Sequence, residues 1–177
     1  KYQLPNPPEA GELNEAISAS VKLLTAAPFA VTAPLFTGIF RAPLGEADFL
    51  LFFSGPTGNG KTVLASLAQQ HWGPELDYQH PPANWSSTAN ANEGMAFQAK
   101  DAVLLIDDFA PGNSIHDASR LHRDADRIFR NAGNGSGRGR MRADGTLRPA
   151  KCPRGLIIAT GEDIPKGQSI RARMLVV

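Results

Sequence analysis

The chain has 177 residues, a length that suits one globular domain able to bury a sizeable core. A hydrophobic content of 42% and a charged content of 20% exclude wholesale disorder, and the net charge is only +1. No apolar run approaches the roughly 18 residues that span a membrane, and Cys152 is the single cysteine. We therefore expect a protein of the reducing cytoplasm with no secretory signal, no membrane partner and no internal disulfide.

The small net charge hides an uneven distribution along the chain. Residues 1–110 carry 5 Lys or Arg against 11 Asp or Glu, a balance of −6, whereas residues 111–177 carry 13 against 6, a balance of +7. A basic half favours an anionic partner, and nucleic acid is the leading candidate. A solvated surface or a contact between subunits would give the same pattern.

Residues 1–45 predict an N-terminal helical segment that packs on a core formed by residues 46–177. A second apolar segment at 29–40 lies between two prolines, Pro28 and Pro43. The first helix is expected over residues 9–26, where apolar residues recur at helical spacing: Leu13, Ile17, Val21 and Leu24.

A glycine-rich octapeptide at 55–62 directly follows a strand predicted over 48–54 and precedes a helix predicted over 62–70. Such a turn aims several backbone N–H groups, and the positive end of the helix dipole, at one point. Lys61 is placed to reach the β- and γ-phosphates, and the Thr62 hydroxyl to complete the shell of a Mg²⁺ ion. The sequence thus predicts a site for a nucleoside triphosphate, made of Gly55, Pro56, Thr57, Gly58, Asn59, Gly60, Lys61 and Thr62.

The rest of the chain alternates between strand and helix patterns, which predicts an α/β fold with three α/β/α layers around a parallel sheet. The helix expected over 114–132 has a predicted buried side made of Ile115, Leu121, Ile128 and Phe129. The expected elements are a loop at 71–82, strands at 84–88, 102–106, 155–160 and from 174 onward, and helices at 90–100 and 114–132.

Two acidic residues end the buried strand that lies about 40 residues after the glycine-rich loop. Asp107 is expected to hold Mg²⁺ through its water shell, and Asp108 to polarise the attacking water. Thr160 ends the next buried strand and is placed to orient that water near the γ-phosphate. Alternatively, its hydroxyl only caps the strand end.

Arg171 and Arg173 lie about a dozen residues after Thr160, just before the last predicted strand. An arginine here is placed to stabilise the charge that develops on the nucleotide of a neighbouring subunit. The alternative is a pair of surface arginines that flank a strand.

A basic segment separates the acidic strand from the strand that ends in Thr160. Asp144-Gly145 is a strong two-residue hairpin signal, so a β-hairpin is expected near residues 138–149. Contacts from its arginines to phosphates would give affinity for DNA without reading its sequence, and few aromatic residues are interleaved, so base stacking is expected to be minor. A flexible basic loop is the alternative. The expected DNA contacts are Arg138, Arg140, Arg142 and Arg148.

In order and type, these motifs resemble those of the AAA+ ATPases. Three stretches more narrowly resemble helicase-like ATPases of phages, plasmids and chromosomal islands, relatives of the minichromosome-maintenance helicases: Trp85-Ser86-Ser87-Thr88, Asp107-Asp108-Phe109-Ala110-Pro111 and Thr160-Gly161-Glu162-Asp163-Ile164-Pro165. The resemblance covers roughly residues 33–177. It implies a hexameric ring that hydrolyses ATP with Mg²⁺ and moves on single-stranded or forked DNA, which a hairpin before the sensor strand contacts inside the ring.

The chain departs from that group in two respects. Many members carry Glu where this chain has Asp108, which leaves Glu93 and Glu162 as alternatives for the catalytic base. The helical lid with its second sensor is missing from these residues, and the apolar run at 174–177 leads us to expect a longer protein. Two other functions remain open: a protein remodeller with the same engine, and a non-hydrolysing ATP-dependent DNA-binding switch or loader.

Overall fold

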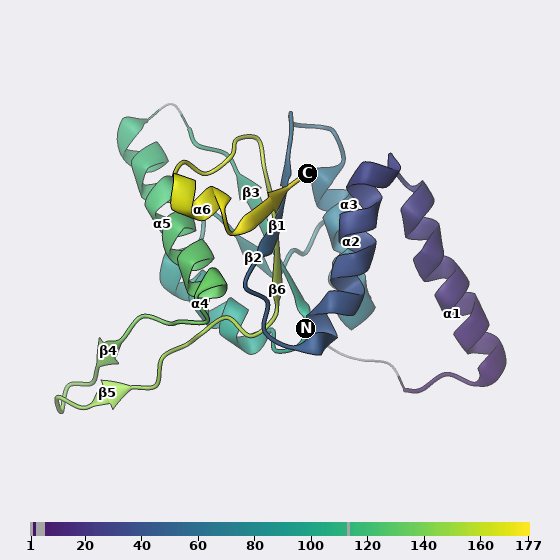
Figure 1. Cartoon of the computed structure of the whole chain (residues 1–177), viewed down its shortest axis with the longest axis horizontal. Helices are drawn as coiled ribbons and strands as arrows, with labels where there is room; N and C mark the ends of the chain where they lie inside the picture. Colours follow the sequence, from purple (N-terminus) through teal and green to yellow (C-terminus); the bar gives the residue numbers. More distant parts are fainter. Residues whose placement is uncertain (1, 3–5, 113) are drawn as a thin grey trace.

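Five short runs of mainly apolar residues form one parallel sheet with the strand order β2-β3-β6-β1-β7 (Figure 1). This computed structural model describes residues 2, 6–112 and 114–177. The sheet confirms the predicted α/β fold around a parallel sheet. Its strands are β1 (Leu50–Ser54), β2 (Ala83–Asn84), β3 (Val103–Phe109), β6 (Leu156–Gly161) and β7 (Met174–Val176).

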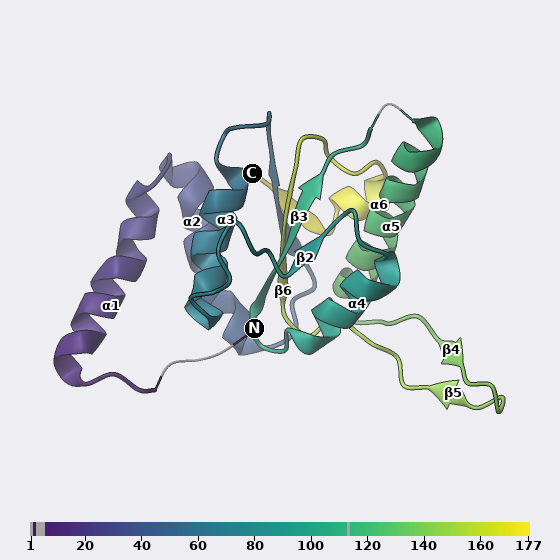
Figure 2. The same ribbon diagram turned by 180° about the vertical axis from the view of Figure 1, so that it is seen from behind.

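Helices cover both faces of the sheet, because alternate strand residues point in opposite directions. In β1, Leu50 and Phe52 join the core on one face, while Leu51 and Phe53 join the core on the other. The two layers of helices are separated by the sheet in both views (Figures 1 and 2). One face holds α4 (Ala89–Gln98), α5 (Ile115–Gly133) and α6 (Gln168–Arg171), and the other holds α2 (Phe29–Arg41) and α3 (Lys61–Gln69).

The N-terminal segment forms two helices that differ in burial. Helix α2 packs on the sheet through Leu35 and Ile39, both buried. Helix α1 (Ala10–Lys22) buries none of its residues, and the apolar side chains of Leu13, Ile17 and Val21 are each about half exposed. Residues 1 and 3–5 of the predicted segment lie outside the described residues. A short 3-10 turn follows each of the helices α1, α2 and α3, at Leu23–Thr25, Ala42–Leu44 and Gln70–Trp72 respectively.

Several element boundaries differ from the sequence prediction for local reasons. Strand β2 has only two residues, because the Asn84 side chain accepts a hydrogen bond from the Ser86 N–H, and Thr88 then caps α4. The expected burial of Ile115 is wrong: it is the first residue of α5 and is 82% exposed. Helix α6 has four residues and was not predicted.

The Gln69 side chain links α3 to the β3 backbone and so fixes the strand that carries Asp107. Its Nε2 donates to the Val103 carbonyl at 2.7 Å, and its Oε1 accepts from the Leu105 N–H at 2.5 Å. The Tyr2 hydroxyl donates to the same Val103 carbonyl at 2.8 Å, and burial raises the pKa of Tyr2 to about 12. Strand β2 pairs only with Ile106 and Asp107 of β3, so these bonds satisfy backbone groups in the earlier part of β3.

A two-stranded antiparallel hairpin, β4 (Arg140–Met141) and β5 (Leu147–Arg148), projects from the body of the molecule. It leaves from the end of the sheet opposite to the glycine-rich loop (Figures 1 and 2). In the part of the chain that the structure describes, no helix has both the length and the apolar character needed to cross a membrane.

Candidate functional site

The octapeptide forms the turn between β1 and α3, as its sequence predicts. Gly58 has φ +85° and Gly60, the residue just before α3, has φ +73°, values that favour glycine. The loop borders a cavity of about 310 Å³, here called the phosphate cavity. Lys61, Thr62, Asp108, Thr160 and Glu162 also line it, so three strand ends contribute to one concave site.

The Lys61 ammonium lies within the turn. Its Nζ donates to the carbonyl oxygens of Gly55 at 2.6 Å and of Pro56 at 2.8 Å. A lysine held here presents its charge to the phosphate cavity, where it would balance the negative charge of a polyphosphate.

Asp107, on β3, contacts both the end of the glycine-rich loop and the neighbouring strand β6. The Thr62 hydroxyl donates to Asp107 Oδ1 at 2.7 Å, and the Thr160 hydroxyl donates to the same oxygen at 2.5 Å. A hydroxyl and a carboxylate in contact provide the hard oxygen ligands that Mg²⁺ prefers. Thr62 and Asp107 therefore fit a magnesium site of the kind found beside phosphate-binding loops.

Asp108 adopts an unusual backbone conformation that directs it into the phosphate cavity. Its φ is +67°, and the register between β3 and β6 shifts between Ile106 and Phe109. The Asp108 N–H donates to the Thr160 hydroxyl at 3.2 Å. A non-glycine residue held at positive φ costs on the order of 1–3 kcal/mol, a strain that concentrates at functional sites.

The two alternative bases, Glu93 and Glu162, lie in different places. Glu162 lines the phosphate cavity beside Asp108, and its carboxylate accepts a hydrogen bond from the Thr57 hydroxyl of the loop. The Glu93 side chain is only 3% exposed and pairs with Arg127 and Arg140 near the root of the hairpin. Of the two, only Glu162 shares the cavity with the loop.

The two arginines before β7 also differ in their surroundings. Arg173 Nη1 donates to the Ser169 carbonyl at 2.6 Å, and its Nη2 donates to Asn134 Oδ1 at 2.8 Å. Arg171, on α6, is exposed, and among the described residues no acceptor binds its guanidinium. Arg171 is thus the member of the pair that presents its charge outward.

The hairpin arginines surround a second polar cavity of about 310 Å³, here called the hairpin cavity. Arg140 is anchored at its edge, because its Nη2 donates to Glu93 Oε2 at 2.6 Å and to Asn90 Oδ1 at 2.7 Å. At the tip, hydrogen bonds from the side chain and backbone of Thr146 lower the pKa of the Asp144 carboxyl. The other predicted DNA contacts, Arg138, Arg142 and Arg148, line the cavity with Lys151.

Phe97 is a lining residue of the hairpin cavity that the sequence did not reveal. It belongs to α4, about 40 residues before the hairpin, and nothing in the local sequence links the two. The Arg154 guanidinium carbon lies 3.8 Å from the centre of its ring, and Arg154 Nε donates to the Phe97 carbonyl at 2.6 Å. An aromatic ring therefore lies among the cations of the hairpin.

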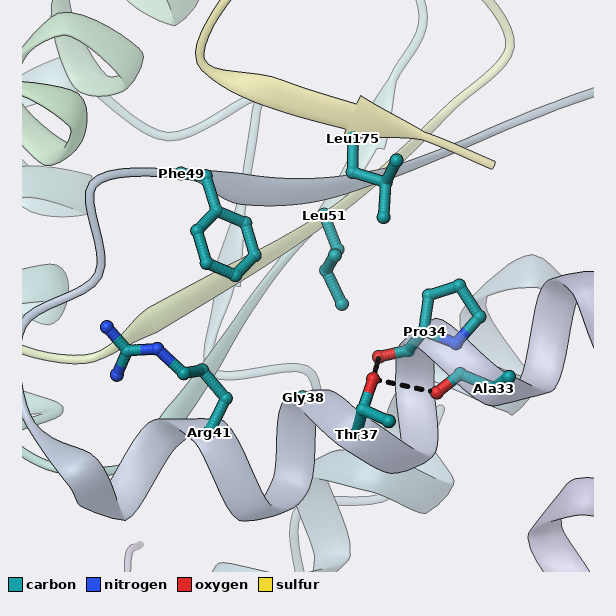
Figure 3. A pocket seen from close by; sticks show the side chains of 8 residues that line it. All are labelled: Ala33, Pro34, Thr37, Gly38, Arg41, Phe49, Leu51 and Leu175. Carbon is teal, nitrogen blue, oxygen red and sulfur yellow. Dashed lines mark hydrogen bonds between the residues drawn. The ribbon is translucent and has the colours of Figure 1, made fainter.

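A third, apolar cavity of about 420 Å³ lies between α2 and the edge of the sheet (Figure 3). Its few polar groups are used locally: the Thr37 hydroxyl donates to the carbonyls of Ala33 and Pro34, and Arg41 Nη2 donates to the Glu46 carbonyl at 2.7 Å. We assign no ligand to this cavity.

The fold and the loop define a class: an α/β chain with a glycine-rich loop at the carboxyl end of a strand in a parallel sheet. Within that class, the chain belongs to the family described as "Domain of unknown function (DUF927)", whose model matches residues 10–152. No curated protein matches the sequence.

Several solved structures show a partial likeness to this chain. The active helicase Cch of SCCmec type IV shares 19% identity over 73% of this chain and 22% of its own, with a TM-score of 0.48. A JCV helicase shares 17% identity over 89% of this chain and 42% of its own, with a TM-score of 0.43. NtrX from Brucella abortus in complex with ADP shares 15% identity over 96% of this chain and 40% of its own, with a TM-score of 0.42. The chain spans less than half the length of each, and likeness at these scores carries no conclusion about function.

Proposed function

We propose that this chain is the ATP-binding and ATP-hydrolysing motor core of a DNA helicase or translocase of the AAA+ type. One observation carries the proposal: the hydroxyls of Thr62 and Thr160 both meet the carboxylate of Asp107 beside the phosphate cavity. A loop that only bound phosphate would need neither the acid nor the hydroxyl of the neighbouring strand. Their meeting at one oxygen supports hydrolysis as well as binding.

The roles follow from the positions around the phosphate cavity. The loop N–H groups and Lys61 bind the phosphates, and Thr62 and Asp107 would hold Mg²⁺, which neutralises charge on the phosphate oxygens when bound. Asp108 accepts the proton of the attacking water, and Thr160 orients that water through its hydroxyl. Glu162 is a second carboxylate within the same cavity.

The proposal includes a ring of identical subunits, a homo-hexamer, with active sites shared between neighbours. Arg171 is exposed on α6 and is available to an adjacent subunit, where it would stabilise charge on the transferred phosphoryl group. Arg173 is held by Ser169 and Asn134 and instead keeps α6 in place against the end of α5. We further propose a replicative role in a phage or mobile element.

DNA is the proposed substrate of the movement. The hairpin carries a concentration of arginines away from the phosphate cavity, and residues 141–151 are all exposed. A basic, projecting surface suits phosphate contacts without sequence reading. A protein remodeller would favour an apolar or aromatic pore residue instead.

ATP turnover measured with and without single-stranded DNA tests the proposal. Stimulation by DNA supports the motor, and Lys61→Ala should abolish turnover in both conditions, because the phosphates lose their principal cation. ATP turnover that is the same with and without DNA would favour a protein remodeller. Binding of DNA that depends on ATP, without any turnover, would favour a switch or loader.

A further inference from the structure

The hairpin cavity combines cations with an aromatic ring, although the sequence separates them. Phe97 comes from α4, whereas Arg138, Arg142, Arg148 and Lys151 come from the hairpin and its two arms. The arms approach closely, since a Cβ on Gly137 would lie 2.8 Å from the Lys151 backbone. The backbones of the two arms are therefore packed together beside the cavity, while the long side chains that line it are exposed.

Arg140 holds the hairpin against α4 and so fixes the distance between the ring and the other cations. Its guanidinium bonds to Glu93 and Asn90, and Glu93 also accepts from Arg127 Nε at 2.5 Å. Within the described residues, no carboxylate forms an ion pair with Arg138, Arg148 or Lys151. Their charge is left for an anionic ligand.

We propose that the hairpin cavity binds an unpaired nucleotide of single-stranded DNA, with its base against Phe97 and its phosphates on Arg138, Arg142 and Arg148. This inference rests on the proposed function. It adds that the bound DNA is single-stranded and that stacking of a base on Phe97 contributes to its affinity. A volume of about 310 Å³ lies at the small end of ligand sites, roughly 300–1,000 Å³, and suits one nucleotide better than a duplex. A base inside a duplex is already stacked on its neighbours and offers the ring no face.

The position of Arg154 strengthens the assignment of stacking to Phe97. Its guanidinium covers one face of the ring, and its bond to the Phe97 carbonyl keeps residue and cation together. The ring is thus held in place before any ligand binds, which lowers the entropy lost on stacking. Base–aromatic stacking tolerates every base, as a translocating motor requires.

The test measures binding of a fluorescent single-stranded oligonucleotide by anisotropy, using the whole chain. Phe97→Ala should weaken binding roughly 5- to 150-fold, the range expected for loss of one stacked base. Phe97→Leu, which keeps most of the packing, should show a similar loss, and Phe97→Trp should restore affinity. Met141→Ala is the matched control: Met141 is 68% exposed on the same hairpin but does not line the cavity, so affinity should not change.

Two further probes separate stacking from charge. A duplex of equal length should bind with the same affinity to the wild type and to Phe97→Ala, and an oligonucleotide without bases should show no difference between them. Thermal unfolding of each variant reports folding, and the Trp variant keeps the test valid if the Ala variant unfolds.

Each outcome decides a different claim. If the wild type binds single-stranded DNA and neither Phe97→Ala nor Phe97→Leu weakens it, the stacking site is wrong while the DNA-dependent motor stands. An equal loss on the duplex or on the base-free strand also overturns the stacking site. If the wild type binds no DNA even at low salt, the stacking site and the DNA substrate both fall.

Discussion

Replacing Glu93 by Gln should destabilise the chain, because this carboxylate joins α4, α5 and the hairpin. Its side chain is 3% exposed and accepts from Arg127 Nε at 2.5 Å, Arg140 Nη2 at 2.6 Å and Asn131 Nδ2 at 3.0 Å. A hydrogen bond to a charged group contributes about 1.5–3 kcal/mol and a neutral one about 0.5–1.5 kcal/mol. Gln keeps one oxygen that accepts from a charged guanidinium, but its amide nitrogen replaces the other acceptor, so loss of one charged hydrogen bond costs about 2–3 kcal/mol.

Urea unfolding followed by tryptophan fluorescence measures this cost, because Trp72 and Trp85 are both buried. In a chain of this size, about 2–3 kcal/mol corresponds to a fall in Tm of roughly 4–12 °C. The amide nitrogen of Gln would also face a guanidinium donor, so this value is a lower bound. Glu93→Ala should cost more, about 3–5 kcal/mol, since it leaves two half-buried arginines without their acceptor.

Asp126→Asn is the matched control for this prediction. Asp126 pairs with Arg130 at 2.7 Å, but the two side chains are 37% and 49% exposed. An exposed ion pair contributes about 0–1 kcal/mol, so this variant should unfold nearly like the wild type. Equal unfolding free energies for Glu93→Gln and Asp126→Asn would refute the claim that Glu93 holds the hairpin root together.

Four other variants test the remaining assignments. Asp108→Asn should lower ATP turnover about 100-fold or more, as expected for a lost general base, and Glu162→Gln less than about 10-fold; the reverse order would transfer the role to Glu162. Arg171→Ala should lower turnover of the assembled protein about 1,000-fold, and normal turnover would rule out this arginine as the residue that acts between subunits. Arg142→Ala should reduce the slope of log K against log salt for single-stranded DNA by about 0.7, and an unchanged slope would show that Arg142 makes no phosphate contact.

The conformation of the glycine-rich loop was predictable because its structure is local. The glycines at 58 and 60 adopt positive φ within a single turn, and the strand before that turn and the helix after it are contiguous in sequence. Buried strands were predictable for a related reason: a sheet covered on both faces requires continuous apolar runs such as 103–106. Helical periodicity was less reliable for burial. It placed Ile115 on the buried side of α5, but it does not reveal that the first turn of this helix lies outside the core.

The sequence by itself therefore determined the α/β fold, the position of the loop and the presence of a hairpin near residues 138–149, since each depends on neighbours within a few residues. The expected two-residue turn at Asp144-Gly145 is wrong: Met141 pairs with Leu147, so the loop centres on Asp144 and is longer. Only the tertiary structure decided which distant side chains meet. It joined Thr62 and Thr160 at Asp107, separated Glu93 from Glu162, and distinguished Arg171 from Arg173. It also brought Phe97 to the hairpin arginines, where the sequence had indicated charge without stacking. These contacts span tens of residues and arise from strand order and helix packing, which no local pattern encodes.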